Sequence, residues 1–162
     1  MPVKFRFPIR RALAGLFAAI AFTDGAAADD GQRASRVPLL PRYQQECAAC
    51  HVAYPPGMLP AASWQRIVNN GQHHFGTDAS LEPAAASELS AWLAANAGTY
   101  KRVREEPPED RITRSSWFIR KHHEVPGATW KLPAVKNAGH CNACHTQAEQ
   151  GDFNERYVRI PR

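Results

Sequence analysis

Two short motifs of the form Cys-x-x-Cys-His limit what this chain can fold into more than any other feature. The first is CAACH at residues 47–51, and the second is CNACH at residues 141–145. Together they use all four cysteines, so no cysteine is left for a separate disulfide framework. In such a motif two thiols can add to the vinyl groups of a porphyrin, and the adjacent histidine can bind the iron as its proximal ligand. The sequence therefore predicts two covalently bound haem c groups, attached through Cys47, Cys50, Cys141 and Cys144, with proximal ligands His51 and His145.

Two other uses of paired cysteines were compared with haem attachment. A zinc ribbon also contains two Cys-x-x-Cys pairs, but here the pairs lie far apart in the sequence and each carries its own histidine. A thioredoxin-like redox motif would need a βαβ context, and the sequence has no such pattern. Haem attachment is the interpretation that accounts for both complete motifs.

The first 28 residues have the organisation of a secretory signal peptide. An apolar stretch is preceded by four basic residues: Lys4, Arg6, Arg10 and Arg11. The apolar stretch, from Ala12 to Phe22, is too short to span a bilayer, and three alanines at 26–28 offer a cleavage site before Asp29. The alternative is an uncleaved membrane anchor, which polar residues 23–24 disfavour. We therefore expect an exported protein that is not integral to a membrane.

Removal of this segment changes the charge that matters for binding. The full chain has a formal net charge of +5 and a pI near 9.3, which would be compatible with nucleic-acid binding. Residues 29–162 keep 16 of the 20 basic and 14 of the 15 acidic residues, a net charge of +2. No nucleic-acid partner is predicted. The remaining chain is poor in long apolar runs and rich in proline, so another group must help to fill its core.

Each haem also needs a sixth ligand or an open face, and methionine is scarce. Only Met1 and Met58 occur, and Met1 would be lost with the signal peptide, so two His/Met haems are excluded. Met58 follows His51 by seven residues in a proline-rich loop, which favours a packing role over ligation of the same haem. The supply of further histidines is larger: His73, His74, His122, His123 and His140.

Two amphipathic helices are predicted after the first motif. One covers residues 60–71 and ends at a glycine. The other covers residues 82–98, begins at a proline and stops at Gly98. Their apolar positions are Trp64, Ile67 and Val68 in the first, and Leu89, Trp92 and Leu93 in the second. The adjacent histidines 73–74 fall in the turn between them. This order resembles the small class I cytochromes c, in which that loop position is usually methionine, and it suggests a His/His variant.

The pattern changes beyond residue 98. Residues 99–110 are charged, contain prolines and lack periodicity, so a surface connection is expected there. A short helix is predicted in residues 111–125, with Ser115 or Ser116 as its cap and Trp117 and Phe118 as its apolar content. A short helix-turn around the second motif follows, and no strand pattern appears.

These elements predict a mainly α fold with two small haem-binding lobes, a class I cytochrome c-like N-terminal lobe and an irregular C-terminal lobe with short helices. The expected division is a signal peptide at 1–28, an N-terminal lobe at 29–98, a connection at 99–110 and a C-terminal lobe at 111–162.

Five stretches of the sequence are together similar to the periplasmic dihaem cytochromes c of photosynthetic and other proteobacteria. They are ECAACHVAYPPGMLPAASWQRI, HFGTDASLE, RITRSSWFIRKHHEV, CNACH and the closing YVRIPR, which sample nearly all of the chain after the signal peptide. The resemblance implies two bis-histidine haems, and it favours His74 and His122 as distal ligands. We assign His74 to the first haem and His122 to the second as a working hypothesis, and which of them serves which haem stays open. The neighbouring His73 and His123 stay open as alternatives. It further implies a periplasmic location, a membrane-bound b-type cytochrome as electron donor and a small oxygen-binding monohaem cytochrome c as acceptor.

Three functions remain open at this point. The chain could be a soluble carrier of single electrons and no enzyme, or a non-catalytic electron-transfer subunit of a periplasmic reductase. The third possibility is a haem enzyme or gas-binding protein with one open haem. The supply of histidines argues against the third, whereas the motifs do not separate the first two.

Overall fold

We analysed a computed structural model of the chain, which describes Met1 and residues 37–162. The predicted signal peptide therefore lies outside the described residues, except for Met1. Within the described part, no helix is both long enough and apolar enough to cross a bilayer.

Four α-helices and a series of 3-10 turns make up the described chain. The helices are α2 (Pro41–Cys47), α3 (Ala61–Asn69), α4 (Pro83–Ala95) and α5 (Ser116–His122). The 3-10 turns are η1 (Pro56–Met58), η2 (Gly71–His73), η3 (Pro108–Asp110), η4 (Ile112–Arg114), η5 (Thr129–Lys131), η6 (Cys141–Ala143), η7 (Ala148–Gln150) and η8 (Glu155–Tyr157). No strand occurs in residues 37–162, where β-pairing is limited to isolated bridges. The expectation of a mainly α fold is confirmed.

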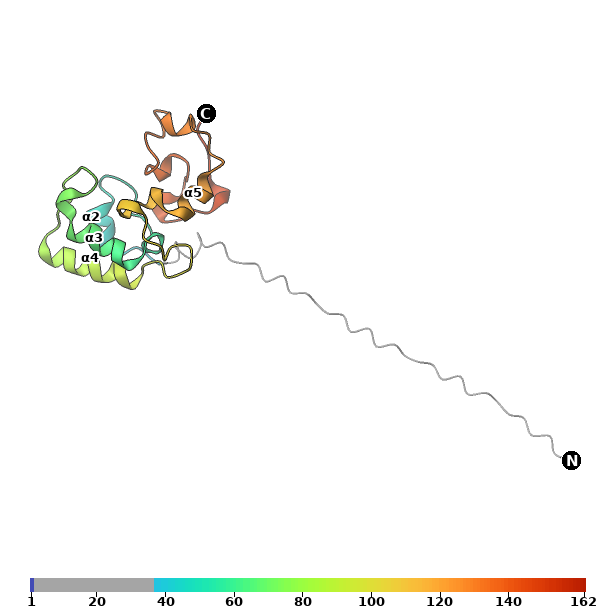
Figure 1. Cartoon of the computed structure of the whole chain (residues 1–162), viewed down its shortest axis with the longest axis horizontal. Helices are drawn as coiled ribbons and strands as arrows, with labels where there is room; N and C mark the ends of the chain where they lie inside the picture. The colour runs from blue at the N-terminus through green and yellow to red at the C-terminus, as the bar shows by residue number, and fades with distance from the viewer. Residues whose placement is uncertain (2–36) are drawn as a thin grey trace.

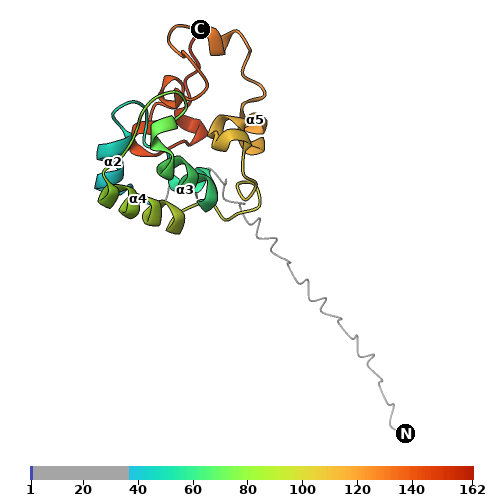
Figure 2. The same cartoon turned by 60° about the vertical axis from the view of Figure 1, so that its left-hand side comes forward.

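Helices α2, α3 and α4 pack together around the main core, and α5 lies beside them with the segments that follow it (Figures 1 and 2). Pro41 and Pro83 stand in the first turns of α2 and α4, where the missing N–H of proline costs no helical hydrogen bond. The buried side chains at the centre are Tyr43, Ala53, Leu59, Trp64, Leu89 and Leu93. Fully burying a leucine side chain stabilises a fold by about 1.5–3 kcal/mol, so this cluster accounts for much of the packing between the three helices.

Residues 99–110 contact the α2–α4 group instead of running free over its surface. Val103 is only 2% exposed, and it packs so closely on Gly98 that a Cβ at Gly98 would lie 2.4 Å from a Val103 methyl group. The Arg66 guanidinium on α3 donates two hydrogen bonds to the Asp110 carboxylate, at 2.9 and 2.7 Å, and one to Glu106 at 2.6 Å. The pKa of Asp110 is lowered mainly by its hydrogen bond from Arg66. Residues 99–110, which the sequence predicts to be a charged surface connection, are therefore held against α3.

Helix α5 begins at a side-chain cap. Ser115 is the N-cap residue, and its hydroxyl oxygen accepts a hydrogen bond from the Phe118 backbone N–H at 3.2 Å. This arrangement satisfies one of the free N–H groups of the first turn. Of the two serines predicted as possible caps, the structure selects Ser115.

The chain after residue 110 has a much smaller apolar core than the chain before it. Residues 37–98 bury nine hydrophobic side chains: Tyr43, Val52, Ala53, Met58, Leu59, Trp64, Ala85, Leu89 and Leu93. Residues 111–162 bury three: Phe118, Val135 and Ala148. Apart from α5, residues 111–162 are therefore built mainly from 3-10 turns and loops around little packed apolar surface.

Candidate haem sites

The first CxxCH motif begins at Cys47, the last residue of α2, and its histidine faces a histidine from the turn after α3. The rings of His51 and His74 have their centroids 6.1 Å apart, with an angle of 20° between their planes. His74 directly follows η2 as its C-cap residue, and its backbone N–H donates a hydrogen bond to the Gly71 carbonyl at 3.2 Å. Two imidazoles that are distant in sequence are thus brought close together with nearly parallel planes.

The surroundings of this first pair orient both rings. His51 Nδ1 lies 2.7 Å from the Val52 carbonyl oxygen. A carbonyl can only accept, so Nδ1 must carry the proton and Nε2 is left with its lone pair. The His51 ring also stacks on Tyr54, with ring centroids 4.7 Å apart. Burial lowers the pKa of His74 below its ordinary value, which favours the neutral imidazole that can bind a metal.

The second CxxCH motif pairs with α5 in the same way. The rings of His145 and His122 have their centroids 6.1 Å apart, and the angle between their planes is 65°. His122 is the last residue of α5, and its Nδ1 lies 2.9 Å from the Phe118 carbonyl oxygen, which fixes the proton on Nδ1 by the same argument. Burial lowers the pKa values of His122 and His145, so both imidazoles favour the neutral form.

Aromatic side chains surround the second pair. Phe118 stacks on His122 with centroids 4.0 Å apart, and Trp130 lies 6.0 Å from the same ring. Phe153 lies 5.3 Å from His145. Two nitrogens in this part of the chain, His145 Nδ1 and Trp117 Nε1, are buried without a hydrogen-bond partner among the described groups. An apolar, aromatic environment with unused donors is suited to a large flat group that carries acceptor oxygens.

The spacing of both pairs fits a single ion between two imidazoles. Nitrogens that bind a first-row metal ion at about 2 Å from opposite sides place the two ring centroids about 6 Å apart. Both pairs have this spacing. Among residues 37–162 no three His, Cys, Asp or Glu side chains form a metal-binding cluster. A haem held at either pair would take two axial ligands from the imidazoles and the other four from its porphyrin.

The other candidate ligands lie elsewhere. His73 and His123 are exposed, and their Nδ1 atoms are near Asn70 Oδ1 (3.0 Å) and the Arg120 carbonyl oxygen (2.7 Å). His140 is near the Val135 carbonyl oxygen, at 3.1 Å. Met58 is buried in η1, in keeping with the packing role expected of it.

Before haem attachment, all four motif cysteines are free thiols. Burial raises the pKa values of Cys47 and Cys141 to about 11, so both are neutral near pH 7. None is tied into a disulfide, and all four are available for thioether bonds.

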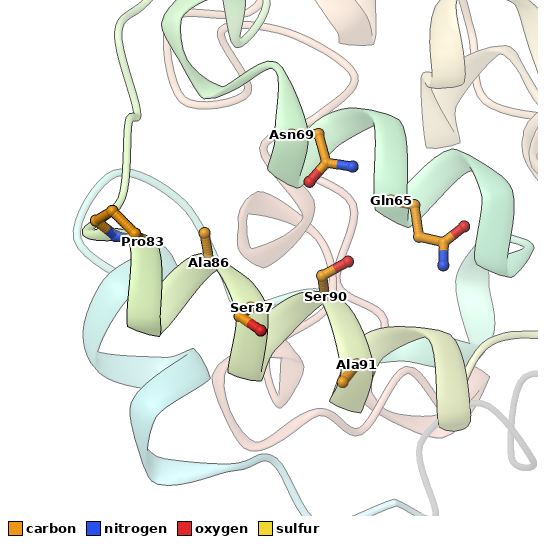
Figure 3. Close-up of a pocket in the computed structure, with 7 residues that line it drawn as sticks. All are labelled: Gln65, Asn69, Pro83, Ala86, Ser87, Ser90 and Ala91. Atoms are coloured by element: carbon orange, nitrogen blue, oxygen red, sulfur yellow. The ribbon is translucent and has the colours of Figure 1, made fainter.

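Two surface cavities were also considered as sites. The larger, about 520 Å³, lies between the outer faces of α3 and α4 (Figure 3) and is lined by Gln65, Asn69, Pro83, Ala86, Ser87, Ser90 and Ala91. It contains no histidine or cysteine and has no part in either pair. The second, about 460 Å³, includes His73, His74 and Phe75 and borders the first pair.

Some residues at these sites were not identified from the sequence. Tyr54, Phe118 and Phe153 all contact a paired histidine. Phe118 was expected only as apolar content of its helix, although its position four residues before His122 places both on one face. Nothing in the local sequence of Tyr54 or Phe153 indicates a contact with a histidine.

Two complete CxxCH motifs, a helical fold and two facing imidazole pairs are features of a c-type cytochrome with two haems. Comparison with known proteins agrees. The model of the dihaem cytochrome c family matches residues 43–153. A dihaem cytochrome c from Shewanella baltica OS155 is 36% identical, with a TM-score of 0.67, and the alignment covers 77% of this chain and 95% of that one. A dihaem cytochrome c from Rhodobacter sphaeroides is 38% identical, with a TM-score of 0.63 and coverage of 72% and 99%. No match was found among curated proteins.

The chain belongs to the dihaem cytochrome c family. Its cofactors are two covalently bound haem c groups, and its general role is electron transfer. The family resemblance inferred from the sequence is thereby confirmed.

Proposed function

We propose that this protein is a periplasmic carrier of single electrons, and not an enzyme, with two bis-histidine haems. Cys47 and Cys50 attach the first haem, and Cys141 and Cys144 attach the second. The axial ligands are His51 with His74, and His145 with His122. The observation that carries this proposal is the 6.1 Å separation of the ring centroids in both pairs, which leaves space for one ion and no open axial face.

When bound, each haem supplies a ferric/ferrous couple that takes up or releases one electron. The chain's own residues fill both axial positions, so neither site offers a place for oxygen or peroxide to bind. Methionine ligation raises the potential of a haem relative to other ligand sets, and therefore we propose a low potential for both haems.

The division into parts is proposed to follow the sequence: a signal peptide at 1–28, an N-terminal lobe at 29–98, a connection at 99–110 and a C-terminal lobe at 111–162. The charges support separate roles for the two lobes. Residues 37–98 carry two basic and four acidic side chains, whereas residues 111–162 carry nine basic and four acidic ones. A formal charge of +5 on the second part favours docking of an acidic redox partner there.

The proposed donor is a membrane-bound b-type cytochrome, and the proposed acceptor is a small oxygen-binding monohaem cytochrome c. Both follow from the family resemblance. Stopped-flow mixing of the fully reduced protein with candidate acceptors tests the role. We expect transfer to one small cytochrome to slow by on the order of tenfold between low and high ionic strength, because salt screens the steering charges.

A charge-reversal variant makes this test specific. Lys131→Glu with Lys136→Glu changes two exposed residues of the basic part and should slow transfer at low ionic strength, with little effect at high ionic strength. Substantial peroxide turnover by the wild-type protein would contradict the carrier role. Slow transfer to every small cytochrome would favour a bound reductase subunit instead.

Electron paramagnetic resonance of the oxidised protein should distinguish the two haems. The imidazole planes are near parallel in the first pair, at 20°, and strongly crossed in the second, at 65°. Near-parallel axial imidazoles give low-spin ferric haem a rhombic spectrum with three resolved g values, whereas crossed planes give a highly anisotropic signal with one large g value. We expect one signal of each kind in equal amounts. Two identical rhombic signals would contradict the geometry proposed for the second site.

A further inference from the structure

Tyr54 is the side chain that connects the two candidate sites. It follows His51 by three residues, in the loop between α2 and η1. Its ring stacks on His51 with centroids 4.7 Å apart and only 19° between the planes. The His74 ring lies 6.1 Å from the same His51 ring. His51 therefore has both Tyr54 and its proposed axial partner His74 as ring neighbours.

The hydroxyl of Tyr54 reaches the second motif. It donates a hydrogen bond to the Gly139 carbonyl oxygen at 2.7 Å, although the two residues are 85 positions apart. Gly139 lies two residues before Cys141, the first cysteine of the second motif. One phenol therefore contacts the proximal ligand of the first site and the segment that enters the second.

The backbone of Tyr54 is also fixed. The Tyr43 hydroxyl donates to the Tyr54 carbonyl oxygen at 2.8 Å, and Tyr43 belongs to the main core with 2% exposure. On the other side, Gly139 donates its N–H to Asn137 Oδ1 at 2.8 Å, which shapes the turn that receives the phenol. Both ends of the Tyr54 contact are thus held by neighbours that are not histidines.

We propose that Tyr54 is a positioning residue shared by the two haem sites. Its ring sets the orientation of the His51 imidazole, and its hydroxyl holds residues 139–141 at a defined distance from the first site. This inference rests on the proposed ligand set. A metal site keeps its geometry only when the residues that contact its ligands are themselves held in place. Electron exchange between two haems depends on the distance between them.

Two substitutions separate the two contacts in the haem-loaded protein. Tyr54→Phe keeps the ring and removes the hydroxyl, so the paramagnetic resonance signal of the first haem should stay as in the wild type. Amide hydrogen exchange in residues 139–144 should become about fivefold faster, the effect of one lost hydrogen bond of ordinary strength. Tyr54→Leu removes both contacts, so the g values of the first haem should shift and the same amides should exchange faster.

Tyr100→Phe is the matched control. It also removes a phenol hydroxyl that donates to a backbone carbonyl, that of Gly57 at 3.3 Å, and Gly57 belongs neither to a histidine pair nor to residues 139–144. We expect wild-type exchange at 139–144 and an unchanged first-haem signal. The proposal is overturned if Tyr54→Phe leaves that exchange unchanged, if Tyr54→Leu leaves the first signal unchanged, or if Tyr100→Phe reproduces either effect.

Failure of the ligand assignment would be recognised separately. A high-spin or His/Met spectrum in the wild-type protein would contradict the proposed ligands before any variant is measured. A normal bis-histidine spectrum that is insensitive to Tyr54→Leu would contradict only the role of Tyr54.

Discussion

Replacing His74 with alanine is expected to make the first haem, and only that haem, high-spin and able to bind carbon monoxide. The His74 ring lies 6.1 Å from the His51 ring, centroid to centroid, and we propose it as the distal ligand of the first haem. Removal therefore leaves one axial position open. Reduced His74→Ala protein should bind one carbon monoxide per chain, whereas the wild-type protein should bind none, as measured by optical titration.

The adjacent histidine provides the control for this experiment. His73 is exposed, and its ring lies 3.0 Å from Asn70 Oδ1 instead of facing the first motif. His73→Ala should keep the low-spin spectrum and bind no carbon monoxide. If His73→Ala makes the first haem bind carbon monoxide and His74→Ala does not, the choice of His74 over His73 as distal ligand is wrong.

His122→Ala should open the second haem in the same way and also destabilise the C-terminal part. Besides facing His145, His122 stacks on Phe118 at 4.0 Å and shares a hydrogen bond with the Phe118 carbonyl. Loss of these two contacts should lower the free energy of unfolding by about 1–3 kcal/mol. Optical spectra with carbon monoxide and thermal unfolding measure the two effects.

His123→Ala is the matched variant for the second site. Its side chain is 67% exposed, and its Nδ1 lies 2.7 Å from the Arg120 carbonyl oxygen. The spectrum should therefore stay as in the wild type, and the free energy of unfolding should change by no more than about 0.5 kcal/mol. A double His74→Ala/His122→Ala protein should bind two molecules of carbon monoxide. Binding of one or none by the double variant would show that another residue occupies an axial position.

Local sequence patterns were sufficient for several elements of this fold. The 3.6-residue spacing around Trp64 and Leu89 predicted α3 and α4, and glycines marked the turns that follow them. The serines before Trp117 predicted the start of α5 to within one residue. These features depend on residues that are close together in the sequence, so they can be predicted from one sequence alone.

Other features depend on contacts between distant residues and could not be predicted. Helix α2 was missed because seven residues are too few to show an apolar period, although Pro41 in its first turn was an available signal. The doubled histidines point in different directions because neighbouring residues of a helix or turn differ by about 100° in orientation, and only the packed fold selects one. The contact between Tyr54 and Gly139 joins residues 85 positions apart, and no local pattern indicates it.

The small apolar core after residue 110 has a consequence for how the protein is made in the cell. Phe118, Val135 and Ala148 are too few to stabilise more than fifty residues of turns, so this part depends on its prosthetic group for much of its folding free energy. Attachment of the second haem and folding of this part should therefore be one event. A chain that leaves the maturation machinery with the second site unfilled would expose its C-terminal part to proteases, and only correctly loaded molecules would accumulate.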